Sequence, residues 1–237
     1  MGVNCMVEPQ NPFANKELST EERIVLRAER EANIETERNG GIPTKNCLIT
    51  LRKAYEDAGN DFKAAETLEQ QNEIYPNPGD YNLIGVYYHN SGNKDKAIDF
   101  FERALDHNPE DYWANFNLGN TLFYKDPKRS RLYLNKAYDL NPSEPCINIL
   151  LGRLDLCEGK EAKAKEKFQI AYDRYEQRWK ANSLNNSDYG WFASVAEELG
   201  KKDKAYEIRS AKPKIEQTSY YDEENLTQTR TKSLTTL

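Results

Sequence analysis

Apolar residues in the middle of the chain recur every three or four positions, which is the spacing of one face of an α-helix. The pattern is clearest in residues 78–111, whose two halves contain DYNLIGVYYHNSG and KAIDFFERALDHNP. Gly92 separates the halves as a helix stop, and Pro109 ends the second half because proline disfavours the α conformation in the residue before it. This segment is therefore predicted to form two antiparallel helices, a helical hairpin.

The same pattern returns with a period of 33 or 34 residues. Three sets of residues share this spacing: Gly85, Gly119 and Gly152; Ala104, Ala137 and Ala171; Pro76, Pro109 and Pro142. A period shared by several positions indicates an internal repeat built from one supersecondary unit. We therefore predict five helical hairpins, over residues 45–77, 78–111, 112–144, 145–178 and 186–213.

Small side chains occupy the repeated positions where two helices are expected to cross. Gly85 and Ala97 leave room for a close approach, and aromatic residues such as Tyr88 and Phe101 fill the space beside them. A leucine at Ala97 is expected to overpack this contact, at a cost of about 1–3 kcal/mol.

This pattern resembles the tetratricopeptide repeat, which has an aromatic residue, Leu-Gly, Tyr, Ala, Phe, Ala and Pro at fixed offsets. The matching residues of the second unit are Tyr81, Ile84, Gly85, Tyr88, Ala97, Phe101, Ala104 and Pro109. The resemblance covers roughly residues 45–213. It implies an all-α fold, a right-handed superhelical solenoid of about five hairpins, and a protein that binds other proteins.

The chain is predicted to divide into four parts. They are a disordered N-terminal segment (1–18), a leading helix and linker (19–43), the repeat domain (44–213) and a disordered tail rich in Ser and Thr (214–237).

The leading helix is indicated by its two ends. Ser19 and Glu22 have the spacing of a capping box, and Gly40-Gly41 with Pro43 ends the helix. We expect it to lie over the first hairpin. The alternative is a mobile or self-docking arm.

Composition and charge exclude several classes of protein. The formal net charge is -6 and the sequence pI is about 5.2, which argues against a nucleic-acid partner bound through its phosphates. No run of about 18 apolar residues offers a membrane span. The first residues contain no apolar stretch typical of a secretory signal.

Cysteine usage points to a reducing compartment. The chain has four cysteines, at positions 5, 47, 146 and 157, with no CxxC pair and only two histidines to join a metal site. We predict four free thiols, no metal site and a cytoplasmic location.

No catalytic motif stands out. The sequence contains no Walker A loop, GxGxxG, GxSxG or HExxH. His89 is a general base in principle, but its Tyr-Tyr-His-Asn setting at a helix end favours a surface or groove histidine. The chain is therefore predicted not to be an enzyme and to carry no cofactor.

The resemblance implies that the first helix of each hairpin lines a concave groove. The groove residues carried over are Lys53, Asn82, His89, Trp113, Phe116, Asn120 and Arg153. Trp113 and Phe116, with Phe123, are expected to grip an apolar or aromatic side chain. Asn82 and Asn120 are expected to hold a peptide backbone. Lys53 and Arg153 are expected to attract a carboxylate. The alternative for Trp113 and Phe116 is burial under the N-terminal helix or between hairpins.

One subclass of the family clamps the C-terminal carboxylate of the chaperones Hsp70 or Hsp90. It needs Lys, Asn, Asn, Lys and Arg at set offsets. This chain has Asn82, Val86, Asn117, Cys146 and Leu150 there when the count starts at unit 78–111, and counting from unit 45–77 fits no better. The chaperone clamp is therefore not matched.

These observations favour a scaffold or assembly factor that holds a partner peptide or helix in the groove. Two alternatives stay open. One is a structural subunit that packs through its convex face or its ends. The other is an unrecognised enzyme or ligand-binding module.

Overall fold

The computed structural model describes residues 18–212, so the predicted segment 214–237 and all but Leu18 of segment 1–18 lie outside the described residues. The chain begins with α1 (Thr20–Arg38), capped by Ser19. The Ser19 hydroxyl accepts the Glu22 N–H and the Glu22 carboxylate accepts the Ser19 N–H, so the predicted capping box is present. α1 packs on α2 through Ala28 and Ala32, as expected of a helix laid over the first hairpin.

Ten further α-helices follow within the described residues and pair into five hairpins, as predicted. The pairs are α2 (Lys45–Asp57) with α3 (Asp61–Ile74), α4 (Tyr81–Asn90) with α5 (Lys94–His107), α6 (Tyr112–Leu122) with α7 (Pro127–Leu140), α8 (Pro145–Cys157) with α9 (Glu161–Lys180), and α10 (Asp188–Glu198) with α11 (Lys202–Ala211). A short 3₁₀ turn, η1 (Pro78–Asp80), precedes α4.

Glycines at positive φ make four of the five turns inside the hairpins. Gly59, Gly92, Gly159 and Gly200 have φ of 67°, 85°, 71° and 74°, a left-handed conformation that L side chains rarely adopt. The turn of the third hairpin has no such glycine. The Asp126 carboxylate accepts the Arg129 N–H and Pro127 begins α7, where its missing N–H costs nothing.

The two helices of a hairpin meet at the repeated small residues. A Cβ added to Gly85 would lie 2.6 Å from Phe101, and one added to Gly152 would lie 2.6 Å from Phe168. Both contacts are tighter than any real Cβ contact. Glycine at these positions therefore sets the distance between the helices.

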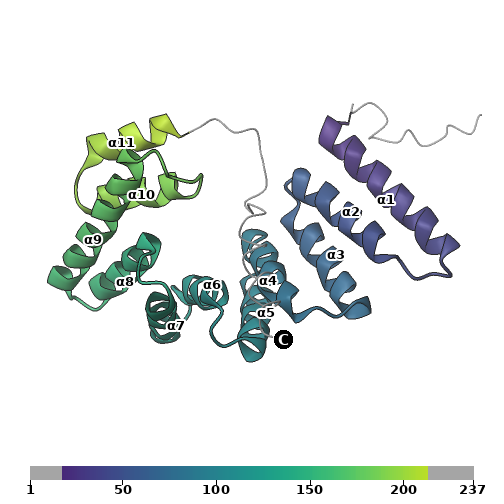
Figure 1. Ribbon diagram of the computed structural model, residues 1–237, viewed down its shortest axis with the longest axis horizontal. Helices are drawn as coiled ribbons and strands as arrows, with labels where there is room; N and C mark the ends of the chain where they lie inside the picture. Colours follow the sequence, from purple (N-terminus) through teal and green to yellow (C-terminus); the bar gives the residue numbers. More distant parts are fainter. Residues whose placement is uncertain (1–17, 213–237) are drawn as a thin grey trace, which may run out of the picture.

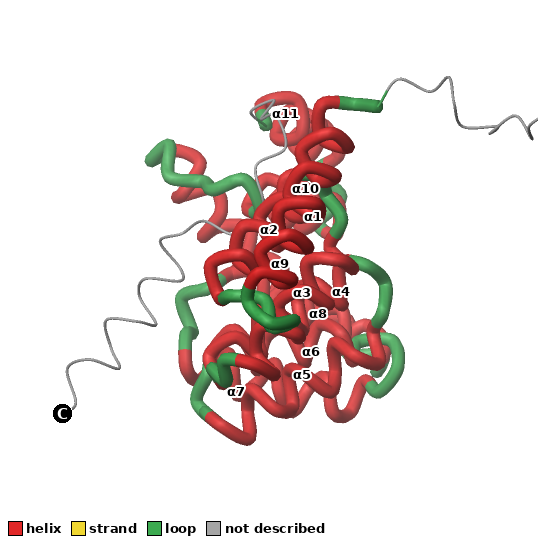
Figure 2. The backbone as a smooth tube through the Cα atoms, turned by 90° about the vertical axis from the view of Figure 1, so that its right-hand side faces the viewer, coloured by secondary structure: helices red, strands yellow, loops and turns green. Residues whose placement is uncertain are grey.

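The hairpins stack into a curved array, shown in Figure 1. The first helix of each hairpin (α2, α4, α6, α8, α10) lies on the concave side, and we call these the inner helices. The second helices lie outside them. Figure 2 shows the array from its edge, with only helices and loops in its described part. This arrangement is an all-α solenoid, as predicted.

The fourth hairpin ends differently from the others. α9 continues to Lys180, and residues 181–187 form a loop in which Asn182 adopts φ 51°. No proline follows the fourth unit, which permits the longer helix. Asn is one of the few residues other than glycine that tolerates this conformation.

Candidate functional site

Aromatic side chains from two inner helices meet on the concave side. Trp113 of α6 packs edge-on against Tyr112 and Phe116, with ring centroids 4.9 and 6.4 Å away. Phe116 in turn packs edge-on against Trp191 of α10, with centroids 6.5 Å apart. We call these four residues the inner aromatic cluster. It joins the third hairpin to the fifth.

Only part of this cluster is accessible. Trp113 is 40% exposed and Phe116 is 7% exposed. Asp111 caps the start of α6 by accepting the Ala114 N–H, which places Trp113 in the first turn of the helix. Phe116 lies one turn further along, on the same side of α6.

The expected three-residue aromatic grip is not what the structure has. Phe116 and Phe123 are both buried, each 7% exposed, in a core shared with Leu150 of α8. The array curves tightly enough for α10 to reach Phe116 through Trp191. Phe116 therefore supports the surface, and Trp113 alone of the three is accessible.

Hydrogen bonds connect α4 to α6 below this surface. Asn117 donates to the side-chain oxygen of Asn82 at 3.1 Å, and His89 Nδ1 lies 2.9 Å from the Thr121 hydroxyl. Burial, and secondarily the charge of Lys94, lowers the pKa of His89. His89 is thus a neutral, half-buried link between two inner helices.

A similar link connects α2 to α4. Arg52 donates to the Tyr87 hydroxyl at 3.0 Å and forms an ion pair with Glu56 on its own helix. Burial raises the pKa of Glu56, and the Arg52 charge opposes this rise. The neighbouring Lys53 is exposed, so its charge stays available.

Arg153 is already occupied. Its Nε lies 2.8 Å from the Glu198 carboxylate and its Nη2 donates to the Ser194 hydroxyl at 2.6 Å, both on α10. Arg153 was expected to attract a carboxylate of a partner, but in the structure it pairs with a carboxylate of its own chain. Arg153 holds α10 against α8.

Asn120 is half-buried on α6, one turn after Phe116. Its side chain makes no hydrogen bond to any residue between 18 and 212. Its whole amide is therefore available to a peptide backbone, whereas the side-chain oxygen of Asn82 already accepts a hydrogen bond from Asn117.

Two kinds of site are not seen in the described part of the chain. Between residues 18 and 212, no three His, Cys, Asp or Glu side chains gather as a metal site would need. In the same range, each helix is too short or too polar to cross a membrane.

The comparison with known protein families gives a match in the second hairpin. Residues 80–111 match the family model described as the tetratricopeptide repeat. This hairpin is a tetratricopeptide repeat. A search of curated protein sequences finds no match.

Solved structures share the fold over 70–80% of this chain. A crystal structure of MamA aligns with a TM-score of 0.55 and 18% identity, over 70% of this chain and 99% of that one. MamA from Desulfovibrio magneticus RS-1 aligns with 0.52 and 17%, over 70% and 91%. PilW, a widely conserved type IV pilus biogenesis factor, aligns with 0.51 and 18%, over 80% and 89%. Identities this low show the fold alone. The chain is thus a solenoid of tetratricopeptide type.

Sequence reasoning named Asn82 and His89 but missed the hydrogen bonds between successive inner helices. The pairs Arg52–Tyr87, Asn82–Asn117 and His89–Thr121 are 35, 35 and 32 residues apart. These separations are close to the repeat period, so comparing polar residues of successive inner helices is a way to find them. Trp191 had no such signal, because its contact with Phe116 joins hairpins that are not consecutive.

Proposed function

We propose that this chain is a protein-interaction scaffold or assembly factor that binds a peptide or helix of another protein on its concave side. The observation that carries the proposal is Trp113, a tryptophan that is 40% exposed on an inner helix and packs against two aromatic rings, Tyr112 and Phe116. Tryptophan is among the residues that most often dominate the free energy of a protein interface.

The surface around Trp113 is already ordered by contacts within the chain. Asn82–Asn117 and His89–Thr121 connect α4 to α6, and Arg153 connects α8 to α10. A partner binding there does not have to order these helices, which lowers the entropy cost of association. The anchor expected on the partner is an aromatic or large apolar side chain that packs on Trp113, with backbone groups at Asn120.

The balance of acidic and basic side chains differs between the two halves of the chain, and this bears on the charge expected of the partner. Residues 19–111 carry 19 acidic and 11 basic side chains, whereas residues 112–212 carry 14 acidic and 18 basic ones. Complementary charge speeds encounter and suppresses wrong partners. These totals include the outer helices, and the inner helices differ from them: α2 carries three basic and two acidic side chains, and α10 carries three acidic ones. A partner segment on the concave side is therefore expected to be acidic where it faces α2 and basic where it faces α10.

A cytoplasmic location and the absence of a catalytic role belong to the same proposal. Cys47, Cys146 and Cys157 are free thiols in the structure, which is usual for proteins of reducing compartments. The division into a leading helix (19–43) and a repeat domain (44–213) is likewise proposed, with the leading helix closing the first end of the array.

Affinity capture with three forms of the full chain tests the proposal. They are wild type, Trp113→Ala and, as matched control, Tyr206→Ala, which removes an aromatic ring that is 75% exposed on the outer helix α11. Circular dichroism first establishes that all three are folded. We expect a set of partners that is retained by wild type and Tyr206→Ala and lost by Trp113→Ala. The same partners with all three forms would contradict binding on the concave side.

A structural subunit that packs through its convex side is the second candidate. Leu132, on the outer helix α7, is 63% exposed. In that case Leu132→Ser changes the assembly seen by size-exclusion chromatography, and Trp113→Ala leaves it intact. The reverse pattern supports the concave side.

A further inference from the structure

A pocket separate from the concave site is formed by the end of α9, the loop after it and the last hairpin. It has a volume of about 340 Å³ and is lined by Trp179, Asn182, Leu184, Tyr189 and Ala211. We call it the end pocket. Trp179 and Tyr189 meet edge-on inside it, with ring centroids 6.0 Å apart. Its volume is at the lower end of the range typical of ligand pockets.

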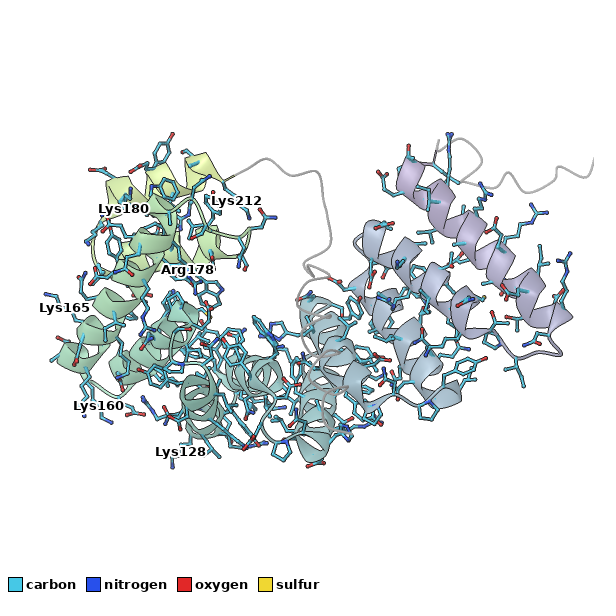
Figure 3. The ribbon with its side chains drawn as sticks, viewed as in Figure 1. Lys128, Lys160, Lys165, Arg178, Lys180 and Lys212 are labelled. Atoms are coloured by element: carbon cyan, nitrogen blue, oxygen red, sulfur yellow. The ribbon has the colours of Figure 1, made fainter. Side chains whose placement is uncertain are left out.

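One lysine side chain lies at the end pocket, and two more lysines follow its lining residues in the sequence. The Lys204 ammonium lies 4.9 Å from the centre of the Trp179 ring. Lys180 and Lys212 directly follow two lining residues, Trp179 and Ala211, and Figure 3 shows both beside the last hairpin. Lys204 also pairs with Glu207, and Lys180 with Glu176, whereas Lys212 has no ion pair among residues 18–212. Aromatic lining with Lys204 over Trp179 suits an aromatic side chain flanked by acids.

The sequence that continues from the pocket has this chemistry. Residues 213–224 read PKIEQTSYYDEE, so two tyrosines are followed by three acidic residues. We propose that the end pocket binds this segment of the same chain, with Tyr220 or Tyr221 on Trp179 and the three acids, 222–224, near the lysines.

Chain length permits this contact. Ala211, a lining residue, precedes Tyr220 by nine positions, and nine extended residues reach about 30 Å. A short tether also gives an effective concentration on the order of millimolar, so a weak contact suffices within one molecule. These two facts favour the chain's own segment over a foreign peptide. Docking there covers the aromatic end of the array.

Fluorine NMR of the full chain tests this contact without truncating it. The three tryptophans, labelled as 5-fluorotryptophan, give three resonances, and Trp179→Phe identifies the one from the pocket. The variant Tyr220→Ser/Tyr221→Ser changes only residues outside the described fold. We expect it to shift the Trp179 resonance and to leave those of Trp113 and Trp191 in place. The control Tyr124→Ser, which alters a ring 86% exposed in the third hairpin, is expected to leave the Trp179 resonance unchanged.

Two results would overturn the proposal. One is a Trp179 resonance that is the same in wild type and in Tyr220→Ser/Tyr221→Ser. The other is a shift that depends on protein concentration, because it would place a second copy in the pocket. A charge variant, Asp222→Lys/Glu223→Lys/Glu224→Lys, adds a second measurement. We expect this charge variant to show at least part of the change in the Trp179 resonance that Tyr220→Ser/Tyr221→Ser shows. A Trp179 resonance at its wild-type position would contradict the pairing of the three acids with lysines.

Discussion

Single residues decide how closely the helices of a hairpin approach. Gly85, Gly119 and Gly152 each face a large buried side chain across the hairpin, at a distance that leaves no space for a Cβ. Glycine lowers helix stability in general, so its presence at the same place in three hairpins needs a packing reason. Gly190, in α10, is different, because an added Cβ there meets no atom within 4 Å.

We therefore predict opposite effects for the same substitution. Gly85→Ala forces a Cβ against Phe101, which is 1% exposed, and lowers the free energy of unfolding by about 1–3 kcal/mol. Gly190→Ala is expected to raise it by about 0.5–1 kcal/mol, because alanine is the better helix former. Urea unfolding of both variants checks this, and equal effects would contradict the packing argument.

His89 makes stability depend on pH. Its pKa is lowered in the folded chain, so the unfolded chain binds the proton more tightly. Its contribution is fully present above the unfolded pKa of about 6.5 and is lost as the pH falls below that value. The pKa values of Glu56, Asp61 and Asp188 are raised and act in the opposite direction, which is why a comparison with a variant is needed.

We predict that His89→Asn flattens this dependence. Unfolding by urea at pH 7, 6 and 5 is compared for wild type, His89→Asn and His107→Asn, since His107 is the other histidine and is exposed. Relative to His89→Asn, wild type is expected to lose stability toward pH 5. His107→Asn is expected to follow wild type. Parallel curves for wild type and His89→Asn would contradict a buried, neutral His89.

The residue scale is also where sequence reasoning reached least far. It named Trp113 and Lys53, which are both exposed, as groove residues, but it did not distinguish the exposed Trp113 from the buried Phe116. Burial of Phe116 depends on Trp191, 75 positions later, and a periodic pattern does not report such a contact. The ion pair of Arg153 was not predicted for the same reason, since its partner lies on α10.

At the scale of helices, one arginine fastens three of them. Arg178 of α9 lies 3.1 Å from Glu144, the residue before α8, and 3.5 Å from Asp188, the first residue of α10. Asp188 is 4% exposed, and burial raises its pKa, while the Asn185 N–H and the Arg178 charge oppose this rise. Removing Arg178 leaves a buried carboxylate without its cation.

Arg178→Met is therefore expected to lower the free energy of unfolding by about 3 kcal/mol at neutral pH. The loss should be smaller at pH 5, because the pKa of Asp188 rises further without Arg178 and more of the carboxyl is protonated as the pH falls. Thermal and urea unfolding measure both values. Lys180→Met serves as control, since the exposed Lys180–Glu176 pair is expected to contribute less than about 1 kcal/mol. A similar loss in both variants would contradict the fastening role.

Helices themselves were the most predictable part of the molecule. Apolar spacing, the Ser19–Glu22 box and glycines at the turns are local signals, and the helices follow them. The contact of α6 with α10 is not local, because it depends on how much each hairpin rotates against the next. That rotation results from many small packing differences.

For the whole molecule, stability comes from contacts between neighbours in the array. The two end helices have little buried surface, with Ala28 and Ala32 in α1 and Ala205 and Ile208 in α11. The central hairpins contact neighbours on both sides.

Hydrogen exchange of the free chain is expected to reflect this order. Backbone amides of α1 and α11 should exchange faster than those of α4–α8, because opening an end breaks one interface and opening the middle breaks two. Mass spectrometry of peptides after timed exchange measures the rates. Uniform exchange along the array would contradict a neighbour-by-neighbour account.

The central claim is that a partner binds along the inner helices, and exchange of the full chain with and without a captured partner tests it most directly. The account predicts new protection in α4, α6 and α8, with α5, α7 and α9 unchanged, so that protection alternates along the sequence. It also predicts that Trp113→Ala removes this protection. Protection confined to the outer helices or to the ends of the array would contradict the account.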